Sequence, residues 1–385
     1  MEAYLDYNAT SPIDPRVAEA MRPYLESTFG NASSFHQKGQ AARHAVETAR
    51  EKIAEMLQVE PGDIIFTSGG TESDNLAVRG AVMEHMLKRR HLVVSTIEHQ
   101  AVLYVAKHLE KRGVRVSYVP VDANGVVNLK ALEGAVTDET ALVSLMHVNN
   151  ETGVIQPIEE AAKIAHAKGA YFHVDAVQSF GKLPIHPEEL GIDLLTISAH
   201  KICGPKGAGA LYLKKGVKIQ ALLHGGHQEK NIRPGTENVA AIAGFGKAVE
   251  LLGQTPAEEQ SRVRKLRDRL HEGLKKSVPD IRLNGDESKR IYNTLNLSFP
   301  GLDGETLLMN LDLKNIYVST GSACTAGSVE PSHVLLAMGL EEKLARAAIR
   351  FSLGRFTTEA EIEYAIQEIP NIITRLRKSS TVKKS

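Results

Sequence analysis

Short apolar runs alternate with longer amphipathic stretches between about residues 39 and 213. The short runs are rich in β-branched residues, and we predict strands at residues 64–66, 92–94, 114–116, 142–145, 171–174 and 194–197. The longer stretches repeat apolar residues every three or four positions, as at residues 42–56 and 158–168, which predicts helices. Because strands and helices alternate, the sequence predicts an α/β fold with a mostly parallel central sheet covered by helices on both faces.

The pattern changes near residues 254–256. Beyond this point we predict a long charged helix at residues 257–277, a strand at 296–299, a helix at 304–311 and a strand at 348–352. Thr358 and Glu361 have the spacing of a capping box that opens a last helix. On the long helix we predict an exposed basic side that carries Arg262, Arg264, Lys265, Arg267 and Arg269.

These changes predict two domains and a tail. The large domain covers residues 13–255. A smaller α+β domain combines residues 1–12 with residues 256–376 and includes the loop around Cys324. Residues 377–385 are polar and basic, so we predict a flexible tail there.

Composition and charge exclude several classes of protein. The chain has 46 basic and 46 acidic residues, and this balance does not favour binding to nucleic acid or to a membrane surface. Two cysteines, Cys203 and Cys324, form neither a disulfide framework nor a four-ligand zinc site, so we predict no bound metal. The chain lacks both a run of ~18 apolar residues and a basic, apolar leader. We therefore expect a cytoplasmic protein.

Lys201 and Asp175 each lie close behind a predicted buried strand. Ligands of parallel sheets bind beyond the carboxyl ends of the strands. A desolvated lysine there could form a Schiff base, and an aspartate could pair with the protonated pyridine nitrogen of pyridoxal phosphate. Near them, Ser198 and His200 could donate to an anion and Gln178 to a ring hydroxyl. The alternatives are a surface lysine in a Gly/Pro turn and an aspartate that caps the next turn.

Three further strand ends carry polar residues that point to the same edge of the sheet. Residues 67–75 contain Gly70 and Thr71 before a helix, an arrangement that can bind phosphate, although Thr71 could instead be a plain N-cap. His99 could stack on a flat cofactor and move protons, or it could be structural. Residues 149–153, which include Asn150, follow another strand. The convergence of five junctions favours a cofactor site over five separate structural roles.

Two residues of the C-terminal part complete the candidate chemistry. Cys324 lies in a run of small residues at 319–328, where a thiol would be accessible as a nucleophile; the alternative is an inert cysteine. Arg350 lies inside an apolar strand, where its charge needs an anionic partner. A substrate carboxylate and a buried structural salt bridge are the two candidates for that partner.

Taken together, the motifs resemble those of the cysteine desulfurases, the NifS/IscS-like group of class V aminotransferases with the fold of type I pyridoxal-phosphate transferases. They are TSGGTESDN, EHQAV, HVNNETG, HVDAVQ, SAHK, RPGTEN and STGSACTAG, and the resemblance runs from residues 4–10 to residues 350–352. Cys203 departs from the family, which commonly carries a larger, often aromatic residue there. We interpret this thiol as an accidental difference without a catalytic role; the alternative is a second reactive thiol near Lys201. Residues 374–385 do not resemble the scaffold-docking segment of the housekeeping enzymes.

The resemblance implies a site built on pyridoxal phosphate. Lys201 would form the internal aldimine, Asp175 would hold the pyridine nitrogen, Gln178 the ring oxygen, and His99 would stack on the ring. The phosphate would bind to Gly70, Thr71, Ser198 and His200 of one subunit and to Thr236 of its neighbour, so a homodimer is implied. Asn150 and Arg350 would bind the substrate carboxylate, and Cys324 would accept the sulfur.

The activity implied is conversion of L-cysteine to L-alanine, with the sulfur left as a persulfide on Cys324. An acceptor such as an iron–sulfur scaffold protein would remove it, and Cys324 could serve as a transient cluster ligand. A selenocysteine lyase, an ordinary aminotransferase and an interaction protein without turnover are the alternatives. The acceptor, a housekeeping or nitrogen-fixation role, and the preference for cysteine or selenocysteine are left open by the motifs.

Overall fold

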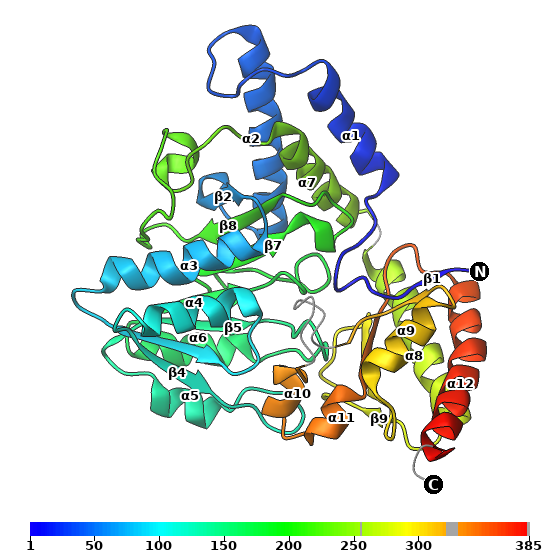
Figure 1. Cartoon of the computed structure of the whole chain (residues 1–385). Coiled ribbons are helices and arrows are strands. Elements are labelled where there is room, and N and C mark those ends of the chain that lie inside the picture. Colours follow the sequence, from blue (N-terminus) through cyan, green and yellow to red (C-terminus); the bar gives the residue numbers. More distant parts are fainter. Residues whose placement is uncertain (255, 321–329, 383–385) are drawn as a thin grey trace.

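A seven-stranded sheet in the order β2-β8-β7-β6-β5-β3-β4 forms the centre of the larger part of the molecule (Figure 1). This computed structural model describes the chain except residues 255, 321–329 and 383–385. The strands are β2 (Ile64–Thr67), β3 (His91–Ser95), β4 (Arg115–Val119), β5 (Thr140–Met146), β6 (Tyr171–Asp175), β7 (Leu194–Ser198) and β8 (Gly209–Leu213). Only β8 runs antiparallel to its neighbours, so the mostly parallel sheet is confirmed. β8 was not among the predicted strands.

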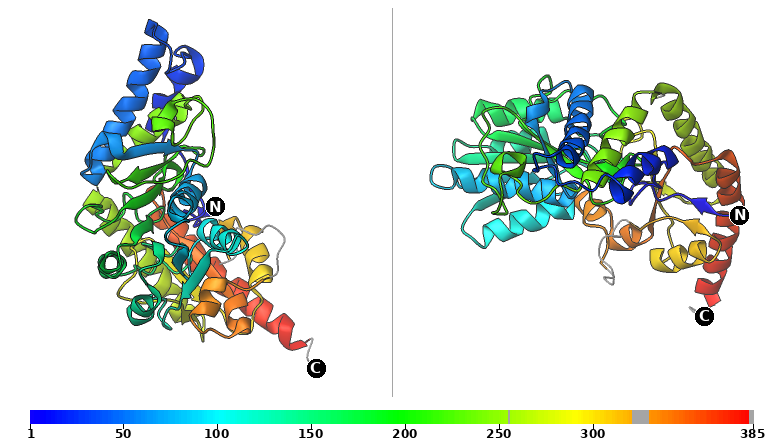
Figure 2. Two further views of the ribbon diagram at one scale, coloured as in Figure 1. Left: turned by 90° about the vertical axis from the view of Figure 1, so that its left-hand side faces the viewer. Right: turned by 90° about the horizontal axis from the view of Figure 1, so that it is seen from above.

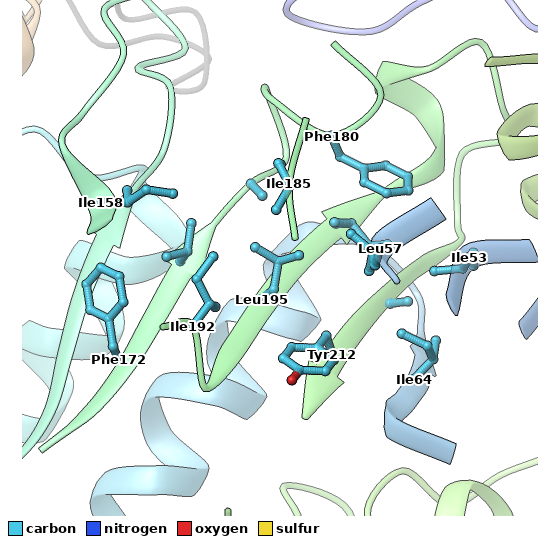
Figure 3. Close-up of a cluster of buried hydrophobic side chains, with 14 of the residues drawn as sticks. Ile53, Leu57, Ile64, Ile158, Phe172, Phe180, Ile185, Ile192, Leu195 and Tyr212 are labelled. Carbon is cyan, nitrogen blue, oxygen red and sulfur yellow. The ribbon is translucent and has the colours of Figure 1, made fainter. Parts of the chain in front are cut away.

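Helices cover both faces of this sheet. They are α1 (Pro15–Glu26), α2 (Gln37–Leu57), α3 (Gly70–His85), α4 (Gln100–Glu110), α5 (Leu129–Ala135), α6 (Ile158–Ala167) and α7 (Val239–Leu252). α3 and α4 pack on one face, while α1, α2, α5, α6 and α7 contribute to the core on the other. Neighbouring residues of β5 point into opposite cores, Leu142 toward α3 and α4 and Val143 toward the others. Figure 3 shows part of the core on the face covered by α1, α2, α5, α6 and α7, around Phe172, Leu195 and Tyr212.

The C-terminal part builds a separate hydrophobic core. Its elements are α8 (Pro256–Ser277), β9 (Arg282–Leu283), β10 (Thr294–Ser298), α9 (Gly304–Asp312), β11 (Ile316–Tyr317), α10 (His333–Ala337), α11 (Glu342–Arg346), β12 (Ala348–Ser352) and α12 (Glu359–Val382). β10 pairs with β9 and β12 in an antiparallel sheet. The first strand, β1 (Ala3–Tyr4), pairs with β11, and Leu5 is buried in this core. The N-terminus therefore lies beside α12 (Figure 2). On these separate cores we propose the two-domain division predicted from the sequence.

Two details of the C-terminal part differ from the expectations. Arg267 is buried, with 8% of its surface exposed, and donates to the carbonyl of Ile291, so its predicted place on the exposed side of α8 is wrong. A buried carbonyl needs a donor, and the long arginine side chain supplies it. α12 runs to Val382, so the predicted start of the tail at residue 377 falls inside the helix.

The capping box of α12 is confirmed by its hydrogen bonds. The N–H of Thr358 donates to the carboxylate of Glu361 (2.7 Å), and the N–H of Glu361 donates to the hydroxyl of Thr358 (3.3 Å). Within the described ranges, no helix has both the length and the apolar character needed to cross a membrane.

Candidate active site

A cavity of about 390 Å³ opens at the carboxyl ends of the parallel strands, next to β12 of the smaller part. Its walls come from Asn8, Ala9, Gly70, Thr71, Asp74, His99, Met146, Asn150, Asp175, Val177, Gln178, His200, Lys201 and Arg350. Nine of the twelve predicted site residues are in this set. The junctions that the sequence placed at one edge of the sheet therefore do meet around one space.

The N-terminus of α3 forms one end of the cavity. Its N-cap is Gly69, at a φ of 151° that favours glycine, so the alternative role of Thr71 as N-cap is wrong. A Cβ atom on Gly70 would lie 2.9 Å from the side chain of Val177, which explains why glycine stands there. The first N–H groups of a helix have no acceptor within it. Close by, the buried hydroxyl of Ser198 has no hydrogen-bond partner among the described residues. These unpaired donors fit a phosphate group.

His200 lies at the same end of the cavity. Its Nδ1 is 3.1 Å from the hydroxyl of Thr10. Burial, and then the nearby charge of Lys201, lowers the pKa of His200 to about 4. The ring is therefore neutral at pH 7 and can act on an anion as a hydrogen-bond donor without adding charge.

Two buried carboxyl groups, those of Asp175 and Asp74, face the middle of the cavity. Asp175 ends β6 and accepts from the N–H of Val177 (2.9 Å). Burial raises the pKa of both groups, and that of Asp74 is raised further by the charge of Asp175. His99 and Lys201 oppose the effect at Asp175. Because His99 and Lys201 favour the charged form of Asp175, it is the better suited of the two to pair with a cationic ring nitrogen.

The amine of Lys201 is held at the mouth of the cavity by the N-terminal segment. It lies in the short 3-10 helix η2 (Ala199–Lys201) after β7 and donates to the carbonyls of Asn8 (2.6 Å) and Ala9 (2.7 Å). Gln178 donates to the same Asn8 carbonyl through its Nε2 (3.0 Å). Residues 8 and 9 were not among the predicted site residues, although they belong to the N-terminal segment that resembles the family.

His99 lies on the cavity wall as the N-cap residue of α4. Its Nδ1 accepts from the N–H of Ala101 (3.2 Å). This bond fixes the orientation of the ring. A structural role as helix cap and a role against a flat cofactor are therefore compatible.

Arg350 and Asn150 form the end of the cavity nearest the smaller domain. The Arg350 guanidinium is buried and donates to the carboxylate of Asp6 (2.7 Å) and to the carbonyl of Asn150 (3.1 Å). Its Nε has no partner among the described residues. The structural salt bridge that the sequence left open does exist, and one N–H remains for a carboxylate.

Three predicted site residues are not in the set that lines this cavity: Ser198, which lies beside Gly70, Thr236 and Cys324. Thr236 is exposed in the segment before α7 and does not line the cavity of its own chain. Cys324 lies outside the described residues. On either side of it, the hydroxyl of Ser319 donates to Asp6 (2.9 Å) and that of Ser332 donates to the buried carboxylate of Glu151. Both described ends of the Cys324 segment are thus tied to carboxylates near Arg350.

The other thiol, Cys203, is buried behind Lys201. It adopts a φ of 61°, and its N–H donates to the hydroxyl of Ser11 (2.8 Å). Burial raises the pKa of the Cys203 thiol, which disfavours the reactive thiolate. The geometry supports the interpretation that this thiol has no catalytic role.

Comparison with known proteins gives consistent results. Residues 3–365 match the aminotransferase class-V family. The chain is 48% identical over 382 residues to the cysteine desulfurase IscS of Dictyoglomus turgidum, covering 99% of this chain and 97% of that protein. A solved structure of a NifS-like protein aligns with a TM-score of 0.92 and 40% identity over 98% of this chain and 100% of that one. SspA in complex with cysteine aligns with a TM-score of 0.83 and 36% identity over 92% and 100% of the two chains. These similarities confirm the predicted fold and the resemblance that the motifs indicated.

Proposed function

The chain belongs to the aminotransferase class-V family and, within it, to the cysteine desulfurases, and from this premise we propose that it converts L-cysteine to L-alanine with pyridoxal phosphate as cofactor. One sulfur atom moves from L-cysteine to the thiol of Cys324, which becomes a persulfide. The atoms balance without an outside oxidant or reductant. The observation that carries the proposal is the convergence of nine residues from separate parts of the chain on one cavity beside Lys201.

The residues of the cavity fit the cofactor in charge and shape. When bound, pyridoxal phosphate supplies a carbonyl that condenses with amines and a protonated ring that withdraws electrons from the substrate. The N-terminus of α3, with Gly70 and Thr71, and the unpaired hydroxyl of Ser198 would hold the phosphate, with His200 as a neutral donor. Asp175 would pair with the ring nitrogen, Gln178 would donate to the ring oxygen, and His99 would lie against the ring.

Substrate orientation would depend on Arg350 and Asn150. The free Nε of Arg350 and the side chain of Asn150 would bind the carboxylate of L-cysteine. The amino group of the substrate would then be directed toward Lys201, which lines the same cavity. The amine of Lys201, held by the carbonyls of Asn8 and Ala9, would then take and return the α-proton.

Sulfur transfer requires Cys324 to come near the bound substrate. Ser319 is tied to Asp6, the direct partner of Arg350. Cys324 follows Ser319 by five residues, and five residues span at most about 18 Å.

We also propose a cytoplasmic homodimer, in which Thr236 of each subunit contributes to the phosphate site of the other. The exposure of Thr236 and its absence from the cavity of its own chain support this. A sulfur acceptor of the iron–sulfur scaffold class would then remove the persulfide sulfur, since several relatives of this chain carry the name IscS.

The test uses the purified protein loaded with pyridoxal phosphate and supplied with L-cysteine. We expect alanine to form and the peptide containing Cys324 to gain one sulfur atom by mass spectrometry. Cys324→Ser should retain the cofactor absorbance but form no persulfide, whereas Cys203→Ser should behave as the wild type. A persulfide formed elsewhere at a normal rate in Cys324→Ser would overturn the assignment. Turnover of selenocysteine but not cysteine would favour the selenocysteine lyase, and absence of alanine would favour the interaction protein.

A further inference from the structure

A second lysine, Lys182, is buried close to Lys201, and the reaction proposed above gives it no role. Only 8% of its surface is exposed. Lys182 and Lys201 together line a small cavity of about 40 Å³, and Lys201 also lines the cofactor cavity. No carboxylate lies within ion-pair distance of Lys182 in the part of the chain that the structure describes. Burial of a charged amine without a counter-ion raises the free energy of the folded state, so a role that offsets this cost is expected for Lys182.

Hydrogen bonds connect the two lysines through one side-chain amide. The amine of Lys182 donates to the Oε1 of Gln178 (3.4 Å). The Nε2 of Gln178 donates to the carbonyl of Asn8 (3.0 Å), and this same carbonyl accepts from Lys201 (2.6 Å). A protonated amine can only donate, so it pairs with the oxygen end of an amide and leaves the NH₂ end to face the other way.

We propose that Lys182 is a positioning residue for the reaction at Lys201: it fixes the Gln178 amide so that its N–H groups face Asn8 and the ring oxygen of the cofactor. The inference rests on the proposed function, because it assumes that Lys201 and Gln178 hold pyridoxal phosphate. Without Lys182, the amide could turn over and present its oxygen to the ring oxygen of the cofactor, and the two acceptors would repel each other.

The charge of Lys182 has a second consequence at the same site. The titratable and charged side chains that share its cavity are those of Tyr7, Lys201, Cys203, Glu259, Tyr292 and Arg355. Glu259 is paired with Arg355 (2.7 Å) and does not neutralise Lys182. Burial, and then the charge of Lys201, lowers the pKa of Lys182 to about 7, while Cys203 opposes the shift. A protonated Lys182 therefore disfavours a second positive charge on Lys201 and its Schiff base, and this repulsion fades above about pH 7.

Two substitutions separate the hydrogen bond from the charge. Lys182→Met removes both, so we expect about tenfold weaker binding of pyridoxal phosphate to the apoprotein and a higher midpoint in the pH titration of the visible Schiff-base absorbance. Lys182→Gln keeps an N–H donor without the charge, so its affinity for the cofactor should stay near that of the wild type while the midpoint still rises. Lys163→Met, which changes an exposed lysine on α6, is the matched control and should change neither quantity.

A double variant distinguishes positioning from a general loss of packing. If Lys182 acts through Gln178, then Lys182→Met should weaken cofactor binding no further in a Gln178→Leu background. The inference is overturned if Lys182→Met and Lys182→Gln bind and titrate as the wild type does, or if Lys182→Met has its full effect on affinity in the Gln178→Leu background. A wild-type protein that binds no pyridoxal phosphate would instead overturn the proposed function itself.

Discussion

The two ends of the cavity differ in how their polar groups are used before any ligand arrives. At the end that we propose binds phosphate (the phosphate end), the hydroxyl of Ser198 has no partner among the described residues and His200 is neutral. The first N–H groups of α3 have no acceptor within the helix. At the carboxylate end, Arg350 is already paired with Asp6 and bound to the carbonyl of Asn150. The donors of the phosphate end are unpaired, and we call them vacant donors. At the carboxylate end, a salt-bridge network already uses the Arg350 guanidinium, and only its Nε lacks a partner among the described residues.

This difference indicates that the two ends make different contributions to the molecule. Vacant buried donors cost free energy in the apoprotein and are satisfied when an anion binds. A buried ion pair instead links distant parts of the chain, and removal of one partner leaves a buried charge. We therefore expect substitutions at the phosphate end to change cofactor affinity and substitutions at the carboxylate end to change the stability of the fold.

The largest effect is expected for Arg350→Leu. This change leaves Asp6 without its cationic partner in a mostly buried position, so the free energy of unfolding should fall by about 3 kcal/mol. Urea unfolding followed by circular dichroism measures the loss. The double variant Asp6→Asn/Arg350→Leu should recover part of it, because the unpaired charge is gone.

Arg346→Leu is the matched control, since the Arg346 side chain pairs with Glu342 across one exposed helical turn. Such pairs contribute roughly 0.5 kcal/mol or less. If Arg350→Leu is no more destabilising than Arg346→Leu, the carboxylate end is not a stabilising network and the contrast between the two ends is lost.

The same contrast explains which parts of the site the sequence could predict. The phosphate end consists of residues that follow strands within short motifs, so local pattern and the geometry of parallel sheets were sufficient for Gly70 and Ser198. The carboxylate end depends on pairs far apart in the chain, and no local pattern links Asp6 to Arg350 or Glu151 to Ser332. The sequence indicated that Arg350 needs an anion but could not identify it as Asp6.

Prediction of the fold was limited in the same way, because local patterns do not identify contacts between distant segments. Six apolar runs rich in β-branched residues were recognised as strands, and each of the six is present. β8 follows β7 after a short Gly- and Pro-containing segment and returns antiparallel. Its partners, β2 and β7, are fixed by tertiary packing rather than by local sequence.

The next effect concerns the pH dependence of stability at the carboxylate end. Burial raises the pKa of Glu151 from 4.5 to about 7, although its hydrogen bond from Ser332 and the charge of Arg350 oppose the shift. The folded state thus binds this proton more tightly than the unfolded chain. The stability contributed by the neutral acid is fully present below pH 4.5 and is lost as the pH rises to 7.

Glu151→Gln cannot ionise, so it should be more stable than the wild type at pH 8 by about 2–3 kcal/mol, with the difference vanishing near pH 4.5. Urea unfolding at both pH values measures this. Glu159→Gln, on the exposed surface of α6, should show no such dependence. If Glu151→Gln is less stable than the wild type at pH 8, the carboxylate of Glu151 is ionised in the fold and supports Arg350 by its charge.

The smallest effect is expected at the phosphate end, where Ser198→Ala removes a hydroxyl without a partner. The stability of the apoprotein should be unchanged, and the affinity for pyridoxal phosphate should fall by about tenfold. Ser144→Ala is the control, because the hydroxyl of Ser144 lies 2.8 Å from the Nδ1 of the buried His173 and so already has a hydrogen-bond partner. That variant should lose stability but keep its cofactor affinity. If Ser198→Ala instead lowers stability as Ser144→Ala does and binds the cofactor normally, the hydroxyl of Ser198 belongs to the core and the phosphate end is not a set of vacant donors.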